Sequence, residues 1–135
     1  MKNLVEKTIT LGAGEGKTAL AIMLALEHAE KDSNVLLVVR NYDEANKVIN
    51  RVCRICTKFH NAMLGLTLRA IELEDGRKIK VRTPNDMLEP GCAYSCVIFD
   101  DCDGEVREES WRELRMVLCM TRQAFIYKIK SAETA

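Results

Sequence analysis

A glycine-rich stretch near the start of the chain, residues 11–18, constrains the fold more than any other part of the sequence. It reads Leu-Gly-Ala-Gly-Glu-Gly-Lys-Thr. An alternating apolar run over residues 5–11 leads into it, and a long apolar run over residues 19–29 follows. These two patterns are typical of a strand and of a helix, so the glycines connect a strand to a helix. That context favours a phosphate-binding loop over a chance cluster of glycines.

The chemistry of such a loop depends on its backbone. Glycines let successive N–H groups turn inward, and the following helix directs the positive end of its dipole at the same point. Lys17 would reach the β- and γ-phosphates of a nucleotide, and the Thr18 hydroxyl would coordinate Mg²⁺. The predicted nucleotide-binding residues are Gly12, Ala13, Gly14, Glu15, Gly16, Lys17, Thr18 and Ala19.

The match to the pattern G-x-x-x-x-G-K-[ST] is complete except at its first position, where Leu11 replaces glycine. Gly12 and Gly14 can supply the turn instead. The alternative interpretation is a glycine-rich turn that ends by chance in Gly-Lys-Thr.

Composition excludes several classes of protein. The 135 residues suit one domain, residues 1–135, and Lys plus Arg equals Asp plus Glu at 20 each. With no net charge, any attraction to nucleic acid must come from a local patch. No apolar run is long enough to span a membrane, and the N-terminus lacks the features of a signal peptide. We therefore expect a cytoplasmic protein, in the host cytoplasm if it is viral, with no membrane partner.

The chain has six cysteines. Cys53 and Cys56 are spaced as C-x-x-C, and Cys92 and Cys96 as C-x-x-x-C, so the four together could hold a structural zinc. The other interpretation, which we favour, is that they are inert buried thiols, because free cysteine is among the most buried residue types.

Apolar periodicity predicts the order of the secondary structure. We expect strands over residues 5–11, 35–40, 66–73, 77–82, 96–101 and 123–129, and helices over residues 18–31, 43–59 and 105–120. The helix over 18–31 is apolar almost all round, which predicts burial on more than one side. The continuous apolar run over 35–39 is typical of a parallel strand covered on both faces. The runs over 66–73 and 77–82 flank Asp75-Gly76, which predicts an antiparallel hairpin.

Two carboxylates follow the apolar run over residues 96–99. If the glycine loop holds a triphosphate, an acidic residue at the end of a hydrophobic strand is needed to hold Mg²⁺ across from the Thr hydroxyl, and Asp100 fits that position. The next residue, Asp101, could orient or deprotonate an attacking water. The sequence thus predicts Thr18 and Asp100 as metal ligands and Lys17 and Asp101 as catalytic residues. The alternative is a solvated strand end followed by an acidic turn.

Taken together, these motifs make the chain resemble a P-loop NTPase of the group that includes helicase motor domains, phage terminase large subunits and RecA-like ATPases. The Walker A-like residues 12–18, the Walker B-like residues 97–101 and the order of elements between them carry the resemblance. It implies an α/β fold: a three-layer, RecA-like domain with a mainly parallel sheet of about five strands and a β-hairpin excursion. It also implies that strand 123–129 inserts between the strands 5–11 and 96–101, with Lys130 or Ser131 near the γ-phosphate.

The function that the resemblance implies is Mg²⁺-dependent binding and hydrolysis of ATP or another nucleoside triphosphate by a minimal P-loop ATPase. The family usually has Glu where this chain has Asp101, one methylene shorter, and no arginine finger is evident. Arg115 or Arg122 could serve a neighbouring copy or a partner protein. The alternative function is a nucleotide-binding regulatory module with little or no turnover.

Four cations in six residues mark the predicted hairpin: Arg77, Lys78, Lys80 and Arg82. Alternation along a strand puts Lys78, Lys80 and Arg82 on one face, which could follow a phosphate backbone. A nucleic-acid partner is one prediction, and a charged face that blocks edge pairing is the other.

Overall fold

The computed structural model describes residues 3–12, 14, 16–29, 34–58, 63–67, 70–73, 76–88, 94–118 and 123–132. In chain order the elements are β1 (Asn3–Leu11), α1 (Lys17–His28), β2 (Asn34–Val38), α2 (Tyr42–Lys58), β3 (Met63–Thr67), β4 (Ala70–Leu73), β5 (Lys78–Arg82), β6 (Tyr94–Asp100), the short 3₁₀ helix η1 (Asp103–Glu105), α3 (Glu108–Leu118) and β7 (Gln123–Ser131).

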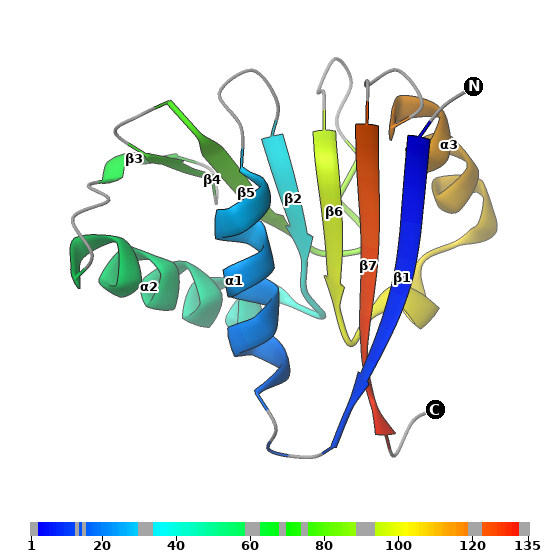
Figure 1. Cartoon of the computed structure of the whole chain (residues 1–135), viewed down its shortest axis with the longest axis horizontal. Helices are drawn as coiled ribbons and strands as arrows, with labels where there is room; N and C mark the ends of the chain where they lie inside the picture. Colours follow the sequence, from blue (N-terminus) through cyan, green and yellow to red (C-terminus); the bar gives the residue numbers. More distant parts are fainter. Residues whose placement is uncertain are drawn as a thin grey trace.

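The strands form one seven-stranded sheet in the order β1-β7-β6-β2-β5-β4-β3 (Figure 1). The first five of these are mutually parallel, and β4 and β3 are added antiparallel at one edge. The last strand, β7, pairs with both β1 and β6, which confirms its predicted insertion between the glycine-loop strand and the Asp100 strand. The carboxyl ends of five parallel strands therefore lie along one edge of the sheet.

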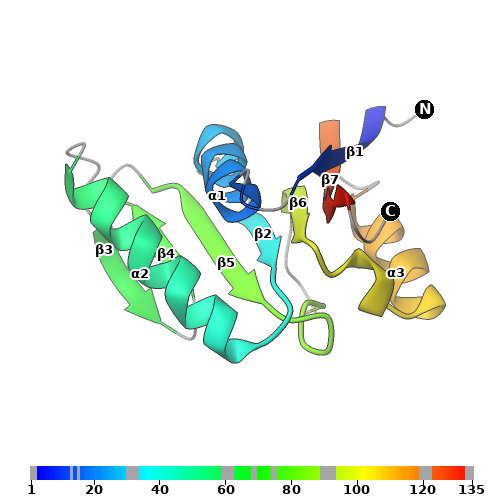
Figure 2. The same ribbon diagram turned by 90° about the horizontal axis from the view of Figure 1, so that it is seen from below.

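Helices cover both faces of the sheet, which makes three layers (Figure 2). One buried cluster joins α1 and α2 to side chains such as Leu37 and Ile98. The other joins α3 to Leu36, Val97 and Phe99. Successive residues in the middle of β2 and β6 thus point to opposite cores, which explains the unbroken apolar runs over residues 35–38 and 96–99. None of the helices in the described part of the chain is long and apolar enough to cross a membrane.

The hairpin differs from its predicted form in two ways. The run over residues 66–73 is not one strand, because β3 and β4 pair with each other as a separate antiparallel unit. The β4–β5 pairing is antiparallel as predicted, but β5 also pairs in parallel with β2. The hairpin is therefore part of the main sheet rather than an excursion, and the sheet has seven strands instead of about five. Nonlocal pairing of β5 with β2 leaves no local pattern in the sequence.

One helix prediction needs correction, and another is supported by the packing. The pattern over residues 105–120 includes η1 and a break before α3 begins at Glu108. In α1, Ala21, Ile22 and Ala25 are buried, but Met23 is 66% exposed. Leu20, Leu24 and Leu26 are partly buried and pack against the same core, so the helix is buried on more than one side as predicted, and among its described apolar side chains Met23 is the exposed one.

Candidate functional site

A cavity of about 210 Å³ lies at the carboxyl edge of the sheet, between the start of α1 and the ends of β2 and β6. Its lining residues are Lys17, Thr18, Val39, Arg40, Asn41, Glu44, Asp100 and Asp101. Four of these are the residues that the sequence predicts as catalytic or metal-binding. The parallel topology brings them together from positions more than 80 residues apart, because α1 and β6 both present their site residues at this edge.

The glycine loop has the backbone that its sequence predicts. Gly14 and Gly16 have φ angles of +77° and +81°, in the left-handed region that favours glycine. Gly16 is the N-cap of α1 and makes no side-chain capping bond, so it leaves the first N–H groups of the helix available to a ligand. Its carbonyl accepts a hydrogen bond from Leu20 N–H at 2.9 Å, which begins the helix. Ala13 and Glu15 lie outside the described residues.

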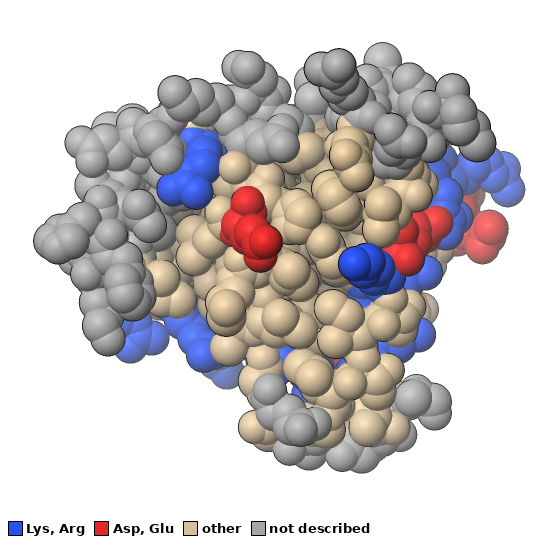
Figure 3. All heavy atoms as spheres, viewed as in Figure 1, with Lys and Arg blue, Asp and Glu red and all other residues tan. Residues whose placement is uncertain are grey.

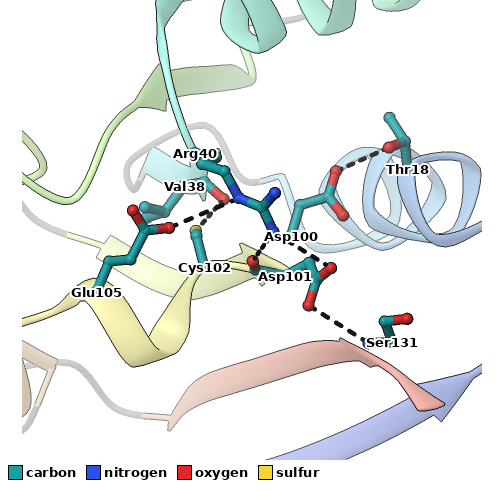
Figure 4. A network of polar contacts seen from close by, with 8 residues as sticks. All are labelled: Thr18, Val38, Arg40, Asp100, Asp101, Cys102, Glu105 and Ser131. Atoms are coloured by element: carbon teal, nitrogen blue, oxygen red, sulfur yellow. Dashed lines mark hydrogen bonds and ion pairs between the residues drawn. The ribbon is translucent and has the colours of Figure 1, made fainter. Parts of the chain in front are cut away.

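The Thr18 hydroxyl donates a hydrogen bond to Oδ2 of Asp100 at 2.9 Å (Figure 4). Burial raises the pKa of the Asp100 carboxyl, and the charges of Asp101 and Glu44 act in the same direction. The Thr18 hydrogen bond and the positive charge of Lys17 oppose that rise. Burial therefore makes the ionised Asp100 costly unless a cation is close to it.

The same pair fits a magnesium ion. A hydroxyl and a carboxylate are hard oxygen ligands, which Mg²⁺ prefers, and usually only one or two such groups from the protein are needed beside phosphates and water. Thr18 and Asp100 are already directed at each other across the cavity. Within the described ranges, no group of three or more His, Cys, Asp or Glu side chains is arranged to hold a metal without such help.

Asp101 is held by two hydrogen bonds to the end of β7. It has a φ of +57°, and among the described residues it is the one non-glycine in this region. Its N–H donates to the Ile129 carbonyl at 2.8 Å, and its Oδ1 accepts a hydrogen bond from the Ser131 N–H at 3.3 Å. The strained conformation is thus held by the end of β7, as is common where a side chain must be aimed. Ser131 thus contacts Asp101 through its backbone, and its predicted place near the γ-phosphate stays a prediction.

Arg40 is a site residue that the sequence interpretation missed. Its Nη2 donates to the Asp101 carbonyl at 3.0 Å and lies 3.4 Å from Asp101 Oδ2, and its Nε lies 3.7 Å from Oε2 of Glu105 (Figure 4). The arginine side chain is 55% exposed, so these contacts contribute little to stability. Its position directly after a buried parallel strand is the signal that could have identified it, because such positions meet at the carboxyl edge of a sheet.

Other predicted residues do not line this cavity. Arg115 pairs with Glu6 at 3.2 Å on the α3 face of the sheet, and its guanidinium lies 5.2 Å from the Trp111 ring centre. Lys130 pairs with Asp103 at 3.3 Å. Arg122 is outside the described residues. The prediction that an arginine from a neighbouring copy completes the site stays a prediction.

The four hairpin cations do not form one exposed face. Arg82 is only 6% exposed, and its guanidinium donates to the Val81 carbonyl at 3.0 Å. Arg77 points to the opposite layer, where it donates to the Leu26 carbonyl at 3.3 Å. Lys78 is exposed but lies opposite Glu72 of β4. Arg82 and Lys78 point to the same face of β5. Because β5 is an interior strand, neighbouring segments cover this face at Arg82.

The cysteines that the structure describes are free thiols. Cys96 is fully buried and Cys53 is half-buried, and burial raises the pKa of the Cys53 thiol. Buried Cys102 donates through Sγ to the Val38 carbonyl at 3.3 Å. Cys92 and the side chain of Cys56 are outside the described residues, so the zinc hypothesis stays a prediction.

Comparison with known proteins supports the fold. The chain is similar to the ATPase domain of the large terminase of Thermus phage P74-26, solved as a point mutant, with a TM-score of 0.64 and 18% sequence identity. The match covers 92% of this chain and 59% of the solved terminase chain, so this chain spans less than two thirds of that ATPase-domain chain. No protein-family model matches the sequence, and no curated protein matches it either.

Proposed function

We propose that the chain binds a nucleoside triphosphate, ATP in the first instance, and hydrolyses it with Mg²⁺. The observation that carries this proposal is the 2.9 Å hydrogen bond between Thr18 and Asp100 in a cavity that Lys17 also lines. Thr18 and Asp100 belong to the two motifs that a P-loop NTPase requires, the glycine loop and the acidic strand end. Their meeting is a property of the fold that neither motif predicts alone.

Each residue has a distinct role in the proposed reaction. The loop N–H groups and Lys17 would hold the β- and γ-phosphates in line for attack. Thr18 and Asp100 would hold the metal, which supplies neutralisation of the charge that develops on the phosphate oxygens. Asp101 would orient the attacking water and accept its proton. The solved neighbour, a terminase ATPase domain by its description, supports hydrolysis as the reaction.

A second candidate is nucleotide binding without useful turnover, and the contacts of Asp101 favour it. Both carboxylate oxygens are engaged, Oδ1 by the Ser131 N–H and Oδ2 by Arg40. A carboxylate with both oxygens engaged must give up one of these contacts before it can accept a hydrogen bond from an attacking water. Its side chain is also short, and misplacement by about 1 Å can cost about a hundredfold in rate.

The test is phosphate release and nucleotide binding with ATP and with GTP in the presence of Mg²⁺. Lys17→Ala should abolish binding, whereas Asp101→Asn should retain binding and lose about a hundredfold or more in turnover. Lys7→Ala, which removes an exposed cation of β1, is the matched control and should change neither. Binding without phosphate release in the wild type would select the second candidate. Absence of Mg²⁺-dependent nucleotide binding would refute both.

A further inference from the structure

The outer face of α2 carries a row of positively charged side chains. Along the middle of the helix, Ala45, Val48, Ile49 and Val52 are buried against the sheet. The residues between them are exposed: Asn46, Lys47, Asn50, Arg51 and Arg54. Spacings of four and three residues put the three cations on one stripe of the helix. We call Lys47, Arg51 and Arg54 the α2 stripe.

Apart from Glu44 at the start of the helix, which forms an ion pair with Lys47, the α2 stripe has no acidic neighbour along α2. Residues 45–58 contain no Asp or Glu, although the whole chain is neutral. Lys47 is 76% exposed and only 3.8 Å from Glu44 at the start of the helix. In the described part of the chain, neither Arg51 nor Arg54 forms an ion pair. Figure 3 shows basic side chains gathered at the lower left, where α2 lies in Figure 1. The stripe is thus a local positive patch on a molecule without net charge.

The dimensions of the α2 stripe match a phosphate backbone. A helix rises 1.5 Å per residue, so the seven steps from Lys47 to Arg54 span about 10 Å. A nucleic acid strand carries one charge per ~3.4 Å of axis, so the stripe faces about three phosphates. Asn46 and Asn50 lie beside it with amide groups that can donate to phosphate oxygens. None of these side chains is an aromatic platform for stacking a base.

We propose that the α2 stripe binds the sugar–phosphate backbone of a nucleic acid without reading its bases. The helix has a direct connection to the nucleotide cavity, because Glu44 in its first turn lines that cavity, as do Arg40 and Asn41 immediately before it. The link between this surface and an NTPase rests on the proposed function. The binding of nucleic acid to the α2 stripe itself requires no nucleotide and no turnover.

The α2 stripe fits this partner better than the hairpin does. Arg82 is buried and Arg77 faces the opposite layer, which leaves Lys78 and Lys80 as the cations on the face. Glu72 lies opposite Lys78 in the register and offsets its charge. The hairpin cations therefore predict weaker attraction for a polyanion than the α2 stripe.

The experiment measures binding of labelled duplex DNA, single-stranded DNA and single-stranded RNA by fluorescence anisotropy, without nucleotide, over a series of salt concentrations. The test variant is Lys47→Gln/Arg51→Gln/Arg54→Gln, since glutamine keeps helix propensity. Its affinity should fall about tenfold or more at ~0.1 M salt. The slope of log affinity against log salt should decrease by about 2 to 3, because each lost phosphate contact removes about 0.9 on duplex DNA and about 0.7 on a single strand.

The control variant is Lys7→Gln/Arg107→Gln/Arg112→Gln, which removes three exposed cations elsewhere and changes the net charge equally. It should bind as the wild type does. The proposal is overturned if the control loses as much affinity, if Lys78→Gln/Lys80→Gln abolishes binding while the α2 variant retains it, or if the wild type binds only anionic phospholipid vesicles. Phosphate release is measured in parallel: binding that follows the α2 stripe without any turnover would refute the proposed hydrolysis and leave this inference intact.

Discussion

Gly16→Ala tests whether the glycine loop depends on its left-handed backbone. Gly16 has a φ of +81°, and a methyl group added there would meet the nearest atom, Ala19 Cβ, at 3.7 Å. That distance is ordinary van der Waals contact, so the substitution causes no clash. Its cost must come from the backbone conformation alone.

The expected size follows from two opposing contributions. An L residue in the left-handed region costs about 1–2 kcal/mol, and replacement of glycine by alanine restores about 0.4–1 kcal/mol by restricting the unfolded chain. The net loss of unfolding free energy is therefore about 1 kcal/mol. In a domain of this size that corresponds to a fall in Tm of about 3–5 °C.

The matched control is Gly104→Ala in η1. Gly104 does not have a left-handed φ, and an added methyl group would have no neighbour within 4 Å. This variant should gain about 0.5–1 kcal/mol, so the same added atom should have opposite effects at the two positions. Urea denaturation of both variants gives the two free energies, and a nucleotide titration should show weakened binding for Gly16→Ala alone.

A Gly16→Ala protein with wild-type stability and wild-type nucleotide affinity would refute the reasoning. It would mean that the loop can bind phosphate with another backbone conformation. Equal destabilisation by both alanines would also contradict it, because the cost would then not depend on φ.

Two further predictions concern Asp100 and the α3 core. Since burial raises the pKa of Asp100, the native state binds the proton more tightly than the unfolded state, and stability should fall as pH rises from the ordinary carboxyl pKa through the raised one. Asp100→Asn should remove that fall and be more stable than the wild type near pH 7, which urea denaturation across this pH range would measure. A steeper fall in the variant than in the wild type would contradict the prediction. Leu114 is fully buried, so Leu114→Ala should lose about 2–5 kcal/mol in the same assay, whereas Met116→Ala on the exposed side of α3 should change stability by less than about 0.5 kcal/mol; similar losses from both would show that α3 does not pack as described.

Local patterns in the sequence predicted most of the fold. The strand–loop–helix unit at residues 5–29 is visible because its period changes from two to 3.6 around a run of glycines. The features that the sequence did not predict depend on contacts between distant segments. Pairing of β5 with β2 made the hairpin part of the main sheet and buried Arg82, and neither follows from the alternation over residues 77–82.

The candidate site divides in the same way. Lys17, Thr18 and Asp100 were predictable because each has a motif with a defined chemistry. Arg40 and the backbone of Ser131 were not, because they reach Asp101 only through the parallel order of β2, β6 and β7. The spacing of the three cations of the α2 stripe is visible in the sequence. Which face of the helix is exposed to solvent depends on what packs against the helix.

By itself the sequence determined the left-handed glycines of the loop, the candidate phosphate-binding and metal-binding residues, and the succession of strands and helices. These depend on φ preferences, side-chain chemistry and periodicity within about twenty residues. Only the tertiary structure decided that Thr18 lies 2.9 Å from Asp100, that Arg40 and Ser131 hold Asp101, and which cations face solvent. The physical reason is that strand order places the carboxyl ends of distant strands at one edge, and strand order is set by burial of the whole sheet rather than by any local segment.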